Sequence, residues 1–117
     1  MDNEQSARTE TRMGNQMIRH VVLFKFHDGV HWDDPRFLSA ESDVLNLPEE
    51  IDEILEWECG RNTAAREIAY DYAIIGSFKN QEAVNAYLYH PTHVRGVEKW
   101  KKFSTWVVTD FESSPST

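Results

Sequence analysis

One short segment of the chain carries residue types suited to acid–base chemistry. Tyr87 and His93 lie six residues apart, on either side of a His90-Pro91 step. A histidine has an ordinary pKa of about 6.5, so it can remove a proton from a carbon between two carbonyl groups at neutral pH. A phenol, with a pKa of about 10, can donate a hydrogen bond to the resulting enolate oxygen without ionising. The pair therefore predicts proton-transfer chemistry.

A purely structural interpretation of the same residues stays open at this point. His90 and His93 could cap helix ends, and Tyr87 could be a core aromatic residue. His20 poses a similar choice, because it shares an otherwise apolar strand face. Burying a polar group without a partner costs roughly 2–7 kcal/mol. His20 is therefore either a cavity-lining residue that orients a substrate carbonyl or a hydrogen-bonded core histidine.

Metal and cofactor sites have little support in the sequence. His90 and His93 have a permissible spacing for one helical face, but Pro91 interrupts it and no carboxylate lies at a ligand interval. No glycine-rich loop joins a strand to a helix, so we expect no flavin, nicotinamide or phosphate cradle. Cys59 is the only cysteine, and we expect it to act as a small hydrophobe. The sequence predicts neither a metal nor a cofactor.

Composition limits the partners and the location. The chain has 117 residues and a mass of 13.7 kDa, enough for one domain with one core. Its 12 basic and 20 acidic residues give a net charge of -8, which argues against nucleic acids and anionic membrane surfaces as partners. The longest apolar run, residues 21–24, is far shorter than the roughly 20 residues of a membrane span. The polar first sixteen residues resemble no targeting peptide, so the cytoplasm is the expected location.

Hydrophobic periodicity predicts alternating strands and helices around these residues. Alternating apolar, β-branched and aromatic residues indicate four strands, at 18–26, 51–59, 70–78 and 103–111. Helical spacing indicates two helices, from 33 or 34 to 46 and from 80 onward, the first ended by Pro48 and the second broken or restarted at Pro91.

The order of these elements predicts the fold class. A β-α-β-β-α-β order is typical of α+β ferredoxin-like domains with one four-stranded antiparallel sheet. The domain would span residues 17–112, with a disordered N-terminal extension at 1–16 and a disordered tail at 113–117. The first strand is apolar on both faces, so we expect a second subunit to cover the face that the helices leave bare.

Three segments together resemble a known family. They are the first strand from Met17 to Phe26, the Ala86–His93 segment at the end of the second helix, and the closing Thr109-Asp110-Phe111. The chain resembles the stress-responsive dimeric A/B-barrel (Dabb) domains. The resemblance implies a dimeric α+β barrel, formed by two sheets packed face to face, with a cavity between sheet and helices in each subunit.

The resemblance also assigns roles to residues. In one member, the plant olivetolic acid cyclase, a tyrosine and a histidine in a Tyr-x-x-His-Pro-x-His segment close a linear poly-β-ketone by an aldol-type reaction. Those positions match Tyr87 and His93, and a cavity-lining histidine of that enzyme matches His20. The other residues expected to bind substrate are Val22, Phe24, Phe37, Tyr72, His90 and Trp100.

The sequence leaves two classes of function open. One is a cofactor-free, polyketide cyclase-like enzyme acting on a β-keto or aromatic substrate, with a cofactor-independent monooxygenase as a variant of that class. The other is a non-catalytic small-molecule-binding or stress-response protein that acts as a dimer. Both classes need an apolar cavity with one or two polar groups.

The two-sided first strand predicts a homodimer. Light scattering at micromolar protein concentration should give about twice 13.7 kDa, because the dimer would cover the apolar face of a single sheet. A monomer at these concentrations would contradict both the expected barrel and the expected partner.

Overall fold

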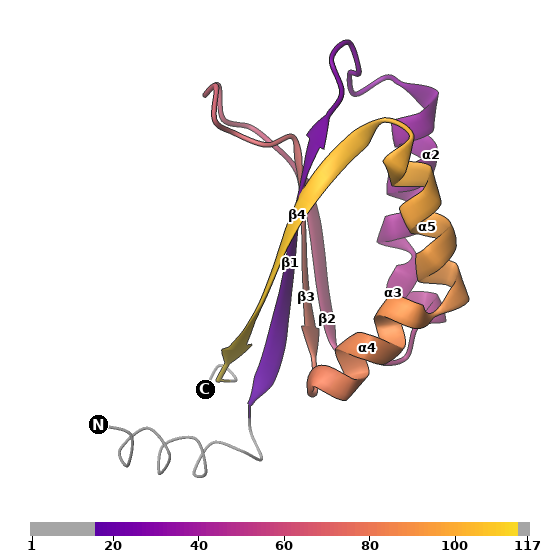
Figure 1. The fold of residues 1–117 in the computed structure, drawn as a ribbon, viewed down its shortest axis with the longest axis vertical. Coiled ribbons are helices and arrows are strands. Elements are labelled where there is room, and N and C mark those ends of the chain that lie inside the picture. Colours follow the sequence, from indigo (N-terminus) through magenta and orange to yellow (C-terminus); the bar gives the residue numbers. More distant parts are fainter. Residues whose placement is uncertain (1–15, 115–117) are drawn as a thin grey trace.

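The computed structural model describes residues 16–114 and arranges them in two layers, a sheet and a set of helices (Figure 1). The elements are β1 (Met17–Phe26), α2 (Pro35–Leu45), α3 (Leu47–Glu50), β2 (Glu56–Arg61), β3 (Tyr72–Phe78), α4 (Gln81–Tyr89), α5 (Pro91–Lys101) and β4 (Ser104–Ser113). This confirms the expected α+β, ferredoxin-like architecture. No helix within 16–114 is long and apolar enough to cross a membrane.

The predicted terminal extensions fall mostly beyond the described residues. Residues 1–15 and 115–117 lie outside them. Ser113, expected to begin the C-terminal tail, instead ends β4, where it pairs with Met17. The predicted start of the tail at residue 113 is therefore wrong. A serine-rich sequence carries no apolar signal even where its backbone completes a strand ladder.

The four strands form one antiparallel sheet in the order β2-β3-β1-β4. The central strand β1 alternates as predicted, with His20, Val22 and Phe24 buried on one face. Its register places His20 between Gly76 of β3 and Asp110 of β4. One row of the sheet thus brings together three residues that lie far apart in the sequence.

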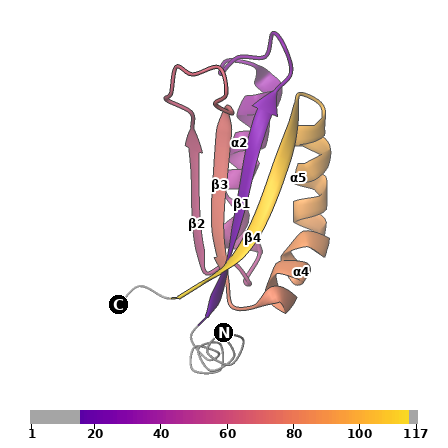
Figure 2. The ribbon, with the colours of Figure 1, turned by 60° about the vertical axis from the view of Figure 1, so that its left-hand side comes forward.

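All the helices cover the same face of the sheet (Figures 1 and 2). Asp34 caps α2 by accepting a hydrogen bond from the Arg36 amide, and Asn80 caps α4 by accepting one from the Ala83 amide. Such caps satisfy amides that have no partner within the helix. The helix that starts after Asn80 ends at Tyr89, and α5 starts again at Pro91, as the sequence predicts.

The predicted start of the second strand is wrong. A strand was predicted over residues 51–59, but β2 begins at Glu56. Ile51 and Ile54 are buried in the core from an irregular segment after α3, so their apolar character reflects burial and not strand pairing. Pro48 lies inside the short helix α3, because a first helical turn needs no proline amide. The other strands begin and end within two residues of the expected bounds.

A group of packed aromatic rings fixes α5 against the sheet. Trp100 stacks on Phe24 of β1 with ring centroids 4.0 Å apart. It also contacts the rings of Phe37, Tyr72 and Phe103. Such buried rings contribute a large share of the apolar area removed from water. The contacts set the height of α5 above β1, and with it the space between them.

No helix within residues 16–114 lies over the opposite face of the sheet (Figure 1). Leu23, Val107 and Phe111 are exposed there, and Val21 and Ile75 are half-buried. The apolar character of β1 on both faces, which the sequence predicts, is therefore present in the fold. An exposed apolar face of this kind is typical of an interaction surface.

Gly76 allows Trp57 to lie flat against the sheet. A Cβ atom at Gly76 would lie 2.8 Å from the Cε3 and Cζ3 atoms of Trp57, well inside van der Waals contact. The Trp57 indole is also held by its hydrogen bond to the Val44 carbonyl, 2.9 Å long. Gly76→Ala should therefore lower the free energy of unfolding by about 1–3 kcal/mol through overpacking. Urea denaturation measures the change.

Gly60→Ala is the matched control. Gly60 lies in the neighbouring strand β2, and nothing lies within 4 Å of a Cβ atom built there. This variant should keep or slightly raise the stability, because alanine restricts the unfolded chain. Equal losses in the two variants would show that the close approach of Trp57 is not what requires glycine.

Candidate functional site

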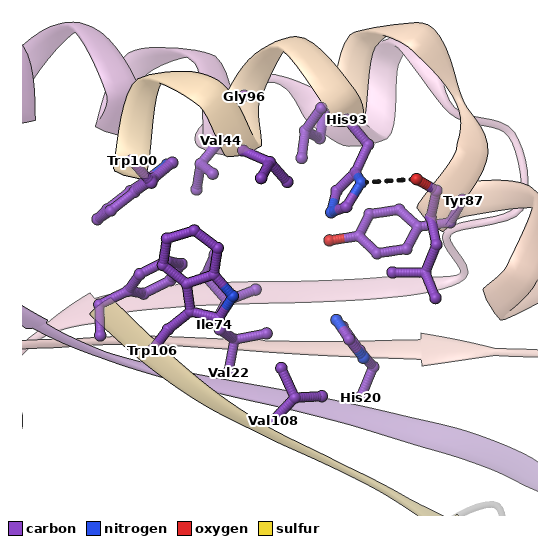
Figure 3. A pocket seen from close by; sticks show the side chains of 14 residues that line it. His20, Val22, Val44, Ile74, Tyr87, His93, Gly96, Trp100, Trp106 and Val108 are labelled. Atoms are coloured by element: carbon purple, nitrogen blue, oxygen red, sulfur yellow. Dashed lines mark hydrogen bonds between the residues drawn. The ribbon is translucent and has the colours of Figure 1, made fainter. Parts of the chain in front are cut away.

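A cavity of about 100 Å³ lies between the sheet and α5 (Figure 3). Its walls come from β1, β3, β4 and the helices, and most of them are apolar. The lining residues are His20, Val22, Phe24, Val44, Leu47, Ile74, Tyr87, Leu88, His93, Gly96, Val97, Trp100, Trp106 and Val108. Val108 of the edge strand β4 faces the helices yet is 52% exposed. This exposure indicates that the cavity opens between β4 and α5.

The structure brings together six of the residues predicted from the sequence. Both predicted catalytic residues and four predicted substrate-binding residues line the cavity: Tyr87, His93, His20, Val22, Phe24 and Trp100. The prediction missed Val108 of β4 and Val44 of α2. Their approach depends on how β4 and α2 pack on the rest of the fold, which no local pattern shows.

Three other predicted substrate-binding residues lie outside the cavity wall. Phe37 is fully buried in the aromatic core. Tyr72 lies behind Phe24 and Trp100, with ring centroids 6.3 and 5.3 Å from theirs. His90 is the N-cap of α5, where its Nδ1 accepts a hydrogen bond from the Thr92 amide. The capping interpretation holds for His90.

The break between α4 and α5 determines which ring nitrogen of His93 carries the proton. In an unbroken helix the Leu88 carbonyl would accept from the amide of Thr92, but that amide bonds to His90. The Leu88 carbonyl is 3.0 Å from Nδ1 of His93 instead (Figure 3). A carbonyl can only accept, so Nδ1 carries the proton and Nε2 keeps its lone pair. His93 thus caps α4 and presents a basic nitrogen.

Burial keeps that nitrogen unprotonated. Desolvation is the main cause that lowers the pKa of His93 below its ordinary value of 6.5, and the neighbouring His20 and His90 lower it further. The hydrogen bond to the Leu88 carbonyl acts in the opposite direction. A neutral imidazole is the form that can accept a proton near pH 7.

Tyr87 lies directly beside this base. The ring centroids of Tyr87 and His93 are 4.4 Å apart, and the Tyr87 side chain is almost completely buried. Burial is the main cause that raises the pKa of its phenol, with Cys59 and Asp110 adding to the effect. The hydroxyl therefore stays protonated and available as a hydrogen-bond donor.

His20 has a charged partner that the sequence prediction missed. Its Nδ1 lies 2.6 Å from Oδ1 of Asp110, and its ring packs edge-on against Tyr87 at 5.3 Å between centroids. Because a carboxylate accepts, Nδ1 donates, and the other ring nitrogen points toward the cavity (Figure 3). Asp110 belongs to a segment singled out in the sequence, but only the β1–β4 register pairs it with His20.

Among the residues that the structure describes, no lysine or arginine lines the cavity. Within residues 16–114 there is also no group of three or more His, Cys, Asp or Glu side chains placed to hold a metal ion. Cys59 lies outside the wall, and burial raises the pKa of its thiol to about 12, which leaves it a poor nucleophile. The polar groups available for chemistry are therefore the imidazoles, the phenol and the indoles.

Comparison with known proteins places this cavity in a family context. The profile of the Stress responsive A/B Barrel Domain family matches residues 18–113. An uncharacterised protein of Streptomyces coelicolor is 45% identical over 96 residues, which cover 82% of this chain and 99% of that protein.

Solved structures share the fold. A protein of unknown function from Bacteroides fragilis, described as dimeric and ferredoxin-like, is 28% identical, with a TM-score of 0.73 over 83% of this chain and 96% of that one. The hydroxynitrile lyase of Passiflora edulis is 16% identical, with a TM-score of 0.73 over 86% of this chain and 96% of that one. Both the sequence match and the architecture lead to one conclusion. The chain belongs to the stress-responsive A/B barrel domain family.

Proposed function

We propose that the protein catalyses proton transfer on a small β-keto or aromatic substrate, without a cofactor, in the manner of a polyketide cyclase. His93 is the general base and Tyr87 the hydrogen-bond donor. The observation that carries this proposal is the pairing of a neutral, tautomer-fixed imidazole with a buried phenol, their rings 4.4 Å apart in the wall of one cavity.

The reaction step follows from the states of these two groups. Nε2 of His93 takes the proton from the carbon next to a substrate carbonyl, and the C–H electron pair moves to form the enolate. The Tyr87 hydroxyl donates a hydrogen bond to the enolate oxygen, which stabilises the developing negative charge. The enolate carbon can then attack a second carbonyl carbon, whose π electrons move to its oxygen. That oxygen takes the proton back from protonated His93, which completes the aldol-type closure and restores the base.

His20 and Asp110 orient the substrate in this scheme. The Asp110 carboxylate holds Nδ1 of His20 at 2.6 Å, which fixes the tautomer and the ring plane. A carboxylate holds a histidine in the same way in the Ser-His-Asp arrangement. His20 can therefore position a substrate hydroxyl or enol group beside the base.

The size of the cavity limits the substrate. About 100 Å³ is below the range of roughly 300–1,000 Å³ common for drug-sized ligands. A long polyketide chain would have to extend through the mouth between α5 and β4, whereas a short dicarbonyl compound fits inside. One protein with the same fold is a hydroxynitrile lyase, so this architecture is compatible with lyase chemistry.

We further propose that the functional unit is a homodimer formed through the open sheet face. The exposed apolar side chains of Leu23 and Val107 lie on that face, and a solved relative with the same fold is described as dimeric. The cavity opens on the other side of the sheet, so dimerisation would leave its mouth between α5 and β4 accessible.

Hydrogen–deuterium exchange tests the catalytic pair without knowledge of the natural substrate. Methyl acetoacetate has a carbon between two carbonyls, and NMR in D₂O follows exchange at that carbon. The wild-type protein should accelerate the exchange. His93→Ala should abolish the acceleration because the base is lost, and Tyr87→Phe should reduce it on the order of 10²-fold because only the oriented donor is lost.

His31→Ala serves as the matched control, because His31 is exposed and lies outside the cavity. It should exchange the probe at the wild-type rate. If the folded wild-type protein gives no acceleration over the control without protein, the catalytic proposal fails and the small-molecule-binding alternative takes its place. If His93→Ala unfolds the protein, His93→Gln tests the base with a polar side chain retained.

The pH dependence of exchange should identify the base. The rate requires neutral His93, whose pKa burial lowers from 6.5, so the rate should be lost as pH falls through a value below 6.5. The titratable groups around His93 are His20, His90 and Tyr87, and Asp110 is bonded to His20. A rate profile from pH 4.5 to about 8 measures the inflection, and an inflection at or above that of free histidine would contradict His93 as the base.

A further inference from the structure

Gly96 lies in the middle of α5, where glycine is less favourable than alanine. Glycine is usually required where the φ angle is positive or where another group approaches closely. Among the described glycines only Gly29 has a positive φ angle. Apart from its chain neighbours and the backbone of its own helix, no atom of residues 16–114 lies within 4 Å of a Cβ atom built at Gly96. Neither requirement applies, so this glycine leaves open space beside α5.

Side-chain contacts show which part of the fold faces this space. The ammonium group of Lys99 bonds to the carboxylate of Asp43 in α2. One and a half turns earlier in α5, the Thr92 hydroxyl donates a 3.1 Å hydrogen bond to Glu50 of α3, so α5 runs antiparallel to α2 and α3. Gly96 lies in the same helical row as Thr92 and Lys99, four residues after the first and three before the second. It therefore faces the part of α2 and α3 between residues 43 and 50.

That part of the chain supplies two buried apolar side chains. Val44 and Leu47 are both 5% exposed, and they line the same cavity as Gly96. Figure 3 shows Val44 and Gly96 on the helix side of the cavity. The cavity thus extends between α5 and the end of α2, as a recess with Gly96 on one side and Val44 and Leu47 on the other. We call this part of the cavity the Gly96 recess.

The walls of the Gly96 recess determine which chemical group fits there. None of its three residues has a polar side chain, so a charged or hydroxyl group would lose its hydration without gaining a partner. Burial of an alkyl group is favourable in the same place. The recess therefore suits an apolar part of a ligand.

The recess lies next to the proposed base. His93 precedes Gly96 by three residues in α5, which is about 4.5 Å along the helix axis, and both line the cavity. A carbonyl carbon followed by a short alkyl chain spans such a distance. A ligand with its reacting carbon beside His93 can therefore place the alkyl group of its ketone in the recess.

We propose that the Gly96 recess binds a short, unbranched alkyl group, and that the ligand is a β-keto compound with that group on its ketone carbonyl. Position 96 then determines how long an alkyl group the site accepts. This inference rests on the proposed function, because it takes the same cavity as the reaction site and names the class of substrate.

Calorimetric titration with two homologous β-keto esters tests the recess. Methyl acetoacetate has a methyl group on its ketone carbonyl, and methyl 3-oxohexanoate has a propyl group in the same position. The wild-type protein should bind the propyl compound on the order of tenfold more tightly, because two further methylene groups are buried. The measurement requires binding and no turnover.

Gly96→Ala places a methyl group in the recess and should lower the ratio of the two affinities severalfold. The variant should also have a higher urea midpoint of unfolding, because alanine favours the helix and no atom obstructs its side chain. Gly60→Ala is the matched control. A Cβ atom at Gly60 also meets no atom within 4 Å, but Gly60 lies outside the cavity, so this variant should keep the wild-type ratio.

Val44→Ala enlarges the recess from the opposite side. When it is combined with Gly96→Ala, the preference for the propyl compound should recover, because the space taken at one wall returns at the other. A role of Gly96 in helix stability alone would not produce this recovery. If the double variant does not fold, the comparison of Gly96→Ala with Gly60→Ala decides the test.

The outcomes separate this inference from the proposed function. Equal binding of the two esters by the wild-type protein, binding of neither, or an unchanged ratio in folded Gly96→Ala would overturn the recess even if His93-dependent exchange occurs. A ratio that depends on Gly96 without any exchange would support the recess as part of a binding protein and would count against catalysis.

Discussion

The break in the helical chain at Pro91 is the constraint on which the site depends. A proline has no amide hydrogen and cannot continue a helix without losing a hydrogen bond. The chain therefore ends α4 at Tyr89 and begins α5 two residues later. The break leaves the Leu88 carbonyl without its helical partner, and His93 supplies the missing donor. A requirement of backbone hydrogen bonding thereby fixes the tautomer of an imidazole.

The same break directs α5 across the sheet. His93 and Trp100 are separated by seven residues, about two helical turns, so they face the same way. One lies at each end of the cavity, and Gly96 between them leaves room for it (Figure 3). The stacking of Trp100 on Phe24 then holds the far end of α5 at a fixed height. The break and the aromatic contact together determine the length and depth of the cavity.

Polar groups in this cavity differ in how completely they are satisfied. The Nδ1 atoms of both histidines have partners in the protein, Leu88 for His93 and Asp110 for His20. The opposite ring nitrogens of both histidines have no hydrogen-bond partner among the described residues, and the one on His20 points toward the cavity (Figure 3). A buried polar atom without a partner weakens a fold, so these free nitrogens in an otherwise apolar wall favour a binding role. The fold alone does not specify that role, because related architectures support different functions.

Local patterns in the sequence were sufficient for the architecture and for part of the site. The alternation of β1, the cap at Asn80 and the restart at Pro91 were all predicted, because each depends on neighbouring residues. The assignment of Tyr87 and His93 to one cavity came from the family resemblance, and their positions on either side of the helix break agree with it. These features depend on interactions within a few residues along the chain.

Only the tertiary structure decided the remaining features. The partner of His20 is Asp110, ninety residues away, and strand register selects it. Phe37 and Tyr72 were expected in the cavity wall but lie in the core behind it. The packing of the helices on the sheet determines which buried rings face the cavity. Ile51 and Ile54 were assigned to a strand, yet they are buried without strand pairing. An apolar pattern shows that a residue is buried, whereas the identity of its neighbours depends on long-range packing that sequence periodicity does not encode.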